Sequence, residues 1–335
     1  MIVKDFFMFR FSVDFRQALQ RTAVLFATAL TMIFIWNYLR IPEGNLLIIV
    51  FAFLLAVRIY DFYSWQIRLK VFGGMICSAI IMQYSVSATH NIQMLNILVP
   101  TAVSCIILRT QPSASAYPAL LTGFLAYTAP AGAYAAALRS IDILIAGATA
   151  WLIIFVLPGK IDPDRTDDPG QPLTAREAFI ESFTIFCAIF LYKMLSIPQG
   201  IWIVLTIIFI YLARQPGKSI TNLIRQRIFS VPLGILLGGI YSGTAVIFDY
   251  RLAYLAPLIG STGFFMLYYR HDFFSFSMLF MIAFTVCADW MTGTFREFNF
   301  LQFLFARSLA TVIGTAVLLF VEKTSAIDST PMSTV

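Results

Sequence analysis

The chain consists of long apolar runs separated by short polar segments. Several runs hold close to 20 residues with few charges, which is the length that an α-helix needs to cross a hydrocarbon core about 30 Å thick. The pattern predicts about twelve spans. The first six cover residues 20–39, 45–60, 70–88, 94–109, 116–135 and 140–158. The other six cover residues 177–195, 200–213, 227–247, 252–269, 273–290 and 302–321.

The same pattern occurs twice in the same order. Ile41–Gly44 reads Ile-Pro-Glu-Gly, and 156 residues later Ile197–Gly200 reads Ile-Pro-Gln-Gly. The apolar run after each copy ends in an arginine, Arg58 and Arg214, which are also 156 residues apart. Six spans per half is an even number, so both halves run in the same direction. The sequence therefore predicts an all-α polytopic membrane protein built from two parallel six-helix repeats.

Polar segments divide the chain into five parts. These are a cytoplasmic N-terminal segment 1–19, a first six-span repeat 20–158, a cytoplasmic linker 159–175, a second six-span repeat 176–321 and a polar C-terminal tail 322–335. The linker is rich in Pro, Gly and Asp, a composition typical of solvated loops. No small-residue cleavage site follows the first apolar run, so we expect that run to be retained as a span.

Composition and charge agree with a membrane protein. The chain is 59% hydrophobic and 12% charged, whereas soluble domains carry about 25% charged residues. If the N-terminus is cytoplasmic, 17 of the 23 Lys and Arg residues fall on the cytoplasmic side, and this excess favours both termini inside. The net charge of +6 is thus explained by orientation. No basic run carries the interleaved aromatic residues of nucleic-acid binders.

The sequence offers no pattern for catalysis or for a bound cofactor. None of the four cysteines forms a CxxC pair, and the two histidines lie far apart. The sequence contains no HExxH motif and no cofactor fingerprint. We therefore expect no enzyme activity, no metal and no cofactor.

Charged residues inside the predicted spans are the strongest functional candidates. Arg307 lies about five residues inside the last span, and Arg139 opens the last span of the first half. Asp142, Asp289 and Glu181 also fall within spans or at their ends. A charge at bilayer depth costs about 3 kcal/mol, so it should face protein or water. Either the arginines form structural pairs, or they bind an anion while the three acids carry protons.

Corresponding positions of the two halves carry residues that could form gates or hinges. These candidates are Pro42, Gly44, Pro198, Gly200, Pro100 and Pro257. The first four belong to the two repeated tags, which we expect on the outer side as hairpin turns or as the rim of a path. The last two fall inside the fourth span of each half, where a proline frees a carbonyl and kinks the helix.

The ninth span has two further features. Gly234 and Gly238 form a GxxxG pattern, which predicts close packing against a neighbouring helix. Arg225 and Arg227 precede the span, and we expect both at the membrane boundary.

The second half resembles the fusaric-acid-resistance type of aromatic acid exporter. The resemblance is carried by Ile197–Trp202, by Gln215–Gly217 after the next span, and by Arg225–Arg227 ahead of a glycine-rich span. The first half is less similar, because it keeps Ile41–Gly44 and Arg58 but lacks the tryptophan and the Gln-Pro pair.

This resemblance implies a bacterial inner-membrane efflux component that works with a periplasmic membrane-fusion adaptor. Distant plant relatives are anion channels that form dimers of six-span subunits, so the chain would be a fused pseudo-dimer around one path. The hypothesis is a proton-coupled exporter of aromatic or other hydrophobic carboxylates, in which Arg139 and Arg307 bind the carboxylate. A passive anion channel and a non-transporting scaffold for an adaptor remain as alternatives, and the oligomeric state stays open.

Overall fold

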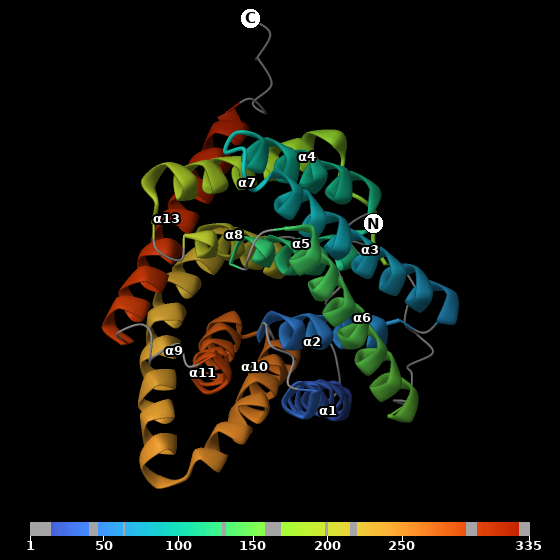
Figure 1. Cartoon of the computed structure of the whole chain (residues 1–335), viewed down its shortest axis with the longest axis vertical. Coiled ribbons are helices and arrows are strands. Elements are labelled where there is room, and N and C mark those ends of the chain that lie inside the picture. Colours follow the sequence, from blue (N-terminus) through green and yellow to red (C-terminus); the bar gives the residue numbers. More distant parts are fainter. Residues whose placement is uncertain are drawn as a thin grey trace, which may run out of the picture.

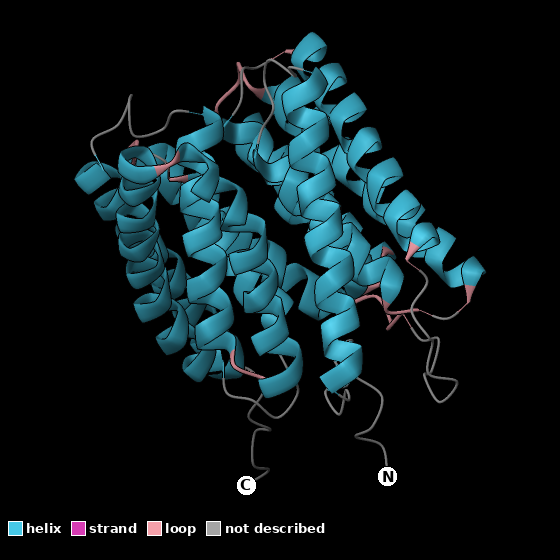
Figure 2. Ribbon diagram, turned by 90° about the horizontal axis from the view of Figure 1, so that it is seen from below, coloured by secondary structure: helices cyan, strands magenta, loops and turns pink. Residues whose placement is uncertain are grey.

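The computed structural model describes residues 15–39, 46–62, 64–128, 132–157, 169–197, 200–214, 220–292 and 300–327. Within these ranges the chain is helical apart from short turns, and no strand occurs (Figure 2). The helices up to residue 157 are α1 Phe15–Leu39, α2 Leu46–Tyr60, α3 Trp65–Thr89, α4 Leu95–Thr110, α5 Ser113–Phe124, η1 Leu125–Thr128 and α6 Ala133–Val156. The later ones are α7 Ala175–Leu195, α8 Ile201–Ala213, α9 Ile220–Phe248, η2 Tyr250–Leu255, α10 Ala256–Arg270, α11 Phe273–Thr292 and α13 Phe300–Ile327.

Each of the twelve predicted spans overlaps an α-helix, although the span predicted at 116–135 extends from α5 through η1 to the start of α6 and the span predicted at 252–269 begins in η2. The helices fall into two length classes. Six of them, α1, α3, α6, α7, α9 and α13, are long and apolar enough to cross a membrane. The other six are shorter or less apolar, with α5 only 12 residues long. The chain is therefore a multi-pass membrane protein of all-α fold.

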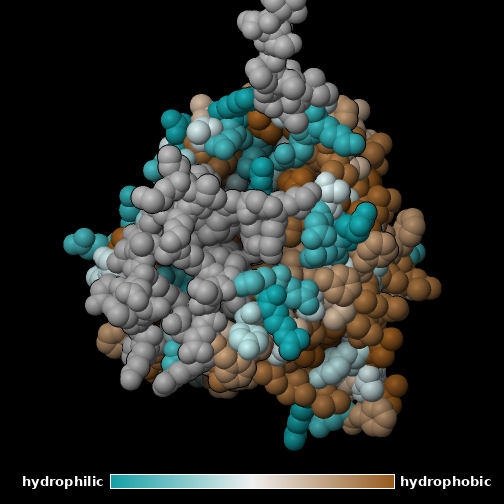
Figure 3. Space-filling view, turned by 180° about the vertical axis from the view of Figure 1, so that it is seen from behind, coloured by the Kyte–Doolittle hydropathy of each residue, from teal (hydrophilic) through white to brown (hydrophobic). Residues whose placement is uncertain are grey.

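The short helices α2, α5 and α8 lie near the middle of the molecule, and longer helices surround them (Figure 1). Every residue of α8 from Ile201 to Tyr211 is buried, which is expected of a helix that is apolar on all sides. The long helices instead turn large apolar side chains outward, such as Phe34, Phe155 and Phe229. Wide hydrophobic areas are visible on the surface (Figure 3), as a lipid-facing surface requires.

Helices from the two parts of the chain pack against each other in pairs. Across the parts, α1 packs on α10, α4 on α7, α5 on α8, and α2 on α11. Within each part, α2 packs on α6 and α8 on α13, while α3 packs on α5 and α9 on α11. The centre of the molecule is thus lined by α5 and α8 together, with α2 and α11 beside them.

The close packing predicted for the GxxxG pattern is confirmed. A Cβ on Gly234 would lie 2.6 Å from the carbonyl oxygen of Met278, and one on Gly238 would lie 2.7 Å from the Cβ of Thr285. Both contacts belong to α11. Glycine is therefore required for the observed approach of α9 to α11.

The two predicted internal prolines differ. Pro100 lies inside α4, and the carbonyl that it leaves without an intrahelical donor, that of Asn96, accepts a hydrogen bond from the hydroxyl of Tyr127. Pro257 lies in the first turn of α10, directly after η2. A proline there replaces an N–H that would have no helical partner. Pro257 therefore lies where the predicted span 252–269 divides into η2 and α10, and not in the middle of an α-helix.

The repeated tags are only partly described. Pro42, Gly44 and Pro198 lie outside the described residues. Gly200 is the N-cap of α8, where a Cβ would lie 2.4 Å from Cδ2 of Tyr192. The turn before α8 therefore packs directly on the end of α7, as a helical hairpin requires.

Candidate functional site

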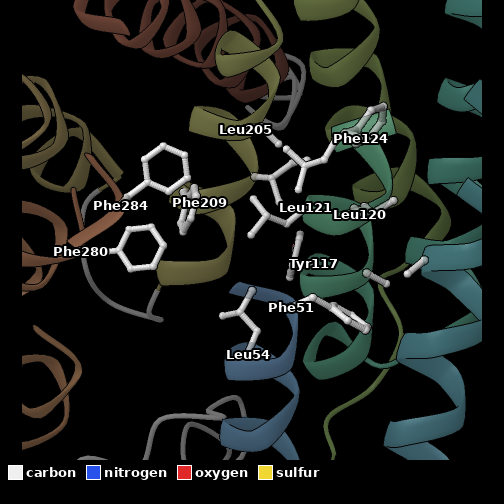
Figure 4. Close-up of a cluster of buried hydrophobic side chains, with 14 of the residues drawn as sticks. Phe51, Leu54, Tyr117, Leu120, Leu121, Phe124, Leu205, Phe209, Phe280 and Phe284 are labelled. Carbon is white, nitrogen blue, oxygen red and sulfur yellow. The ribbon is translucent and has the colours of Figure 1, made fainter. Parts of the chain in front are cut away.

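A small apolar pocket with a cavity volume of about 10 Å³ lies among α5, η1, α8 and α11. Its lining residues are Leu121, Leu125, Trp202, Leu205, Phe209, Phe280 and Phe284. Figure 4 shows Phe209 between Leu121 on one side and the rings of Phe280 and Phe284 on the other. Ring contacts join the walls, since Trp202 meets Phe284 edge to face at 5.1 Å between centroids. The pocket is therefore a narrow apolar gap between aromatic rings.

A buried arginine lies directly behind two of these rings. Arg307 of α13 is 6% exposed, and its guanidinium carbon is 3.1 Å from the ring centroid of Trp202 and 5.2 Å from that of Phe284. A third ring, Phe303, lies 4.9 Å away. Cation–π contacts of this kind contribute about 2 kcal/mol when they are desolvated. The rings therefore stabilise the charge without neutralising it.

Arg307 also has free hydrogen-bond donors. Its Nε and Nη1 are buried and have no partner among the described residues. Among the residues that the structure describes, no acidic side chain forms an ion pair with Arg307. Asp289, which we expected at a similar depth, accepts a hydrogen bond from the hydroxyl of Ser242 instead. The guanidinium is therefore a buried cation that is able to accept an anion.

A second buried arginine was missed by the sequence analysis. Arg227 is 2% exposed inside α9, so the expectation that it lies at the membrane boundary is wrong. Its Nη1 donates to Oγ of Ser277 at 2.7 Å, and its guanidinium carbon is 4.8 Å from the ring centroid of Phe209. Its Nε has no partner in the described ranges. Ser277 also bonds Ser230 at 2.7 Å, and both serines are buried. This contact joins two helices that are far apart in the sequence, so the sequence alone gave no signal for it.

The two buried arginines occupy the two ends of the pocket along α8. Trp202 and Phe209 are seven residues apart on that helix, which corresponds to about 10 Å at 1.5 Å per residue. Arg307 stacks on the first ring and Arg227 on the second. The pocket is thus apolar in its lining and flanked by positive charge.

Arg139 has a different environment from Arg307. It lies two turns inside α6 and not at its start, because α6 begins at Ala133. Its Nε donates to Oε1 of Gln83 at 2.8 Å and its Nη2 to Oγ of Ser87 at 3.1 Å, both on α3. Asp142 follows one turn later on α6 and is also buried. These bonds hold α6 to α3.

The structure also keeps the two predicted arginines apart. The helix of Arg139, α6, packs on α1, α2 and α3, whereas the helix of Arg307, α13, packs on α7, α8 and α9. The predicted anion ligands therefore belong to different helix groups, and Arg227 is the arginine that accompanies Arg307.

Glu181 lies at the contact between the two parts of the chain. This buried carboxylate of α7 accepts a hydrogen bond of 2.8 Å from the hydroxyl of Tyr117 on α5. The ring of Tyr117 stacks on Tyr211 of α8 at 6.2 Å between centroids. The hydroxyl of Tyr211 donates to Oγ1 of Thr184, one turn after Glu181 on α7, at 3.2 Å. Glu181 thus has a neutral partner that keeps it inside the protein.

Comparison with known proteins gives one match. Residues 187–321 match a family described as fusaric acid resistance protein-like. No curated protein and no solved structure matches the chain. The matched segment is less than half of the chain, and it contains Trp202, Phe209, Arg227 and Arg307 together with the α11 wall of the pocket. The match confirms the resemblance of the second half to fusaric acid resistance proteins, a family that is related to transport and not to catalysis.

Proposed function

We propose that the chain is an inner-membrane efflux transporter for aromatic or other hydrophobic carboxylates, with both termini cytoplasmic. The observation that carries this proposal is Arg307, a buried cation with two free donors behind the rings of an apolar pocket. An aromatic carboxylate has the matching chemistry, since it combines a flat apolar body with one negative charge.

The pocket is small. Its cavity volume of about 10 Å³ is about the least that holds one water molecule. A ring therefore enters only when the lining side chains move apart, and a single-ring carboxylate needs less of this movement than a large polycyclic compound.

The buried charge of Arg307 is the reason why a carboxylate would bind. A buried arginine without a counter-ion costs about 3 kcal/mol at bilayer depth. A carboxylate that meets Nε and Nη1 would form two parallel charge-assisted hydrogen bonds and remove most of this cost. Trp202 and Phe284 separate the guanidinium from the pocket lumen, so we propose that a side-chain rotation of Trp202 opens the contact. Of the two predicted arginine ligands, Arg307 is the one with free donors, and Arg139 supports the fold.

Helix packing supports the two-repeat arrangement as part of this proposal. If α1 corresponds to α7 and α4 to α10, the packing of α1 on α10 is equivalent to that of α7 on α4. The contacts of α2 with α11 and of α8 with α5 form a second equivalent pair. A pseudo-two-fold axis would then pass between α2, α5, α8 and α11, where the pocket lies.

Proton coupling is proposed for Glu181 first. Its carboxylate is buried, bonded to a neutral hydroxyl and located between the two parts of the chain. Asp289, bonded to Ser242 across α9 and α11, and Asp142, next to the bonded Arg139, are the other candidates. A periplasmic membrane-fusion adaptor is the proposed partner, by the family resemblance alone.

The test is flux of radiolabelled benzoate into proteoliposomes that contain the purified chain, with and without an imposed pH gradient. We expect saturable, gradient-dependent flux that Arg307→Gln abolishes and that Lys323→Gln, an exposed change on the same helix, leaves intact. Gradient-independent flux would favour the passive channel. No flux from the chain alone, together with co-purification of an adaptor, would favour the scaffold. Unchanged flux in Arg307→Gln would remove the assignment of this arginine.

A further inference from the structure

We propose that Arg227 is a second anion-binding residue and that Arg227 and Arg307 form two successive stations for the same anion, one at each end of the apolar pocket. This inference rests on the proposed function, because it concerns the path of the same substrate. It adds a residue that the sequence analysis placed at the membrane boundary.

The first argument is that both arginines share the same unusual environment. Each is almost fully buried, each stacks on an aromatic ring of α8, and each keeps a buried Nε without a partner in the described part of the chain. Neither forms an ion pair with an acid of the described residues. Buried charges are normally paired, so two unpaired cations beside one pocket indicate a ligand that brings negative charge.

The second argument is their spacing. The two rings, Trp202 and Phe209, are about 10 Å apart along α8, and Leu205 of the pocket lies between them on the helix. A single-ring carboxylate at one station would push the lining rings apart and place its own ring between them. The same molecule can then turn its carboxylate to the other arginine once Trp202 or Phe209 has rotated aside.

Two adjacent stations would let the anion move through the protein. An anion held by one deep site leaves slowly, whereas adjacent sites allow entry and exit to be fast at both ends. Both guanidinium groups are positive, so an anion that lies between them is attracted by each. Under the proposed orientation α8 runs from the outer side to the cytoplasmic side, so Arg227 is the inner station and Arg307 is the outer one.

The residues around Arg227 fit a ligand-binding role better than a purely structural one. Its Nη1 is oriented by Ser277, which is in turn bonded to Ser230. This leaves the buried Nε, which has no partner among the described residues, for an incoming carboxylate. A counterpart is missing 156 residues earlier, where the chain has Val71, so the repeat alone does not explain a buried arginine at this place.

The test compares Arg227→Gln with Arg225→Gln, a matched control that removes an exposed arginine two residues earlier on the same helix. Benzoate binding is measured as the rise in melting temperature of the purified chain at constant ionic strength, and benzoate flux is measured in proteoliposomes. We expect Arg227→Gln to lower flux at least tenfold and to keep benzoate binding within about twofold, since Arg307 still binds. The double variant Arg227→Gln with Arg307→Gln should lose the benzoate-induced rise completely.

The outcomes separate this inference from the proposed function. Normal flux in Arg227→Gln, with flux lost in Arg307→Gln, overturns the second station and leaves the transporter intact. If Arg227→Gln does not fold, Arg227→Lys decides: retained flux supports a charge requirement, and flux lost in the folded lysine variant overturns it. If the unaltered chain shows no benzoate flux, the proposed function fails, and the station is then judged by binding alone. A rise in melting temperature that is equal in the unaltered chain and in the double variant would refute both stations.

Discussion

Replacing Arg307 by methionine should stabilise the protein while it abolishes transport. The side chain is buried, has two donors without partners, and lies against three aromatic rings. Burial of the charge costs about 3 kcal/mol, and the cation–π contacts return about 0.5–2 kcal/mol. Methionine fills a similar volume and packs well on aromatic rings. The net expectation is a gain of about 1–2.5 kcal/mol.

The assay is the melting temperature of the purified protein in detergent and in a buffer without carboxylates. One kcal/mol shifts the melting temperature by about 2–4 °C for domains of 150–250 residues, so we expect a rise of a few degrees. Benzoate should stabilise the unaltered chain and have no effect on Arg307→Met, because a ligand stabilises only the state to which it binds.

The matched control is Arg139→Met, for which the expected sign is opposite. This change leaves the side chains of Gln83 and Ser87 without their donor, and a buried group that loses its partner costs about 1–3 kcal/mol. The melting temperature should therefore fall. If Arg307→Met is destabilised as strongly as Arg139→Met, then Arg307 has a structural partner, and the reasoning that makes it an anion ligand fails.

Three further predictions concern other parts of the structure. Glu181→Gln should keep benzoate flux down a concentration gradient and lose its dependence on pH gradient, because the amide can bond Tyr117 but cannot release a proton; flux that still follows the imposed gradient would contradict this. Tyr127→Phe should lower the melting temperature by an amount equivalent to about 1–3 kcal/mol, since the carbonyl of Asn96 loses its donor, and an unchanged value would show that the carbonyl finds another donor. Gly234→Ala should destabilise the chain by about 1–3 kcal/mol, because the added methyl group meets α11, whereas Gly243→Ala on the same helix has open space and should be neutral or stabilising.

Hydropathy predicted the helices well because a long apolar segment in lipid must form a helix, whatever tertiary contacts it makes. The runs 45–60 and 200–213 correspond to α2 and α8 with only small changes in their bounds. The pattern failed where a helix continued past a charged residue. It placed the start of the ninth span at residue 227, whereas α9 begins at Ile220, because an arginine in a helix looks like a boundary unless its burial is known.

The chemistry of the site depended on contacts that a single sequence does not contain. Arg139 and Arg307 follow the same local pattern, an arginine before a serine near the start of an apolar run. Their environments differ because α3 presents a glutamine and a serine to the first, while α8, α11 and α13 present only aromatic rings to the second. The Gly234 and Gly238 packing was predictable, since small residues at this spacing have few other uses in a span.

Arg139 has polar partners and Arg307 has free donors, and this difference matters for how one of two similar halves comes to have a binding site. A buried arginine is tolerated in either half only if something offsets the cost of its charge. In the first half polar side chains do so permanently, which fixes α6 to α3. In the second half the compensation is incomplete, and the free donors of Arg307 and Arg227 are available to a ligand. If the two halves are repeats of one unit, as proposed, the first serves as a rigid support and the second binds. Only the second then needs the uncompensated charge that the proposed transport site requires.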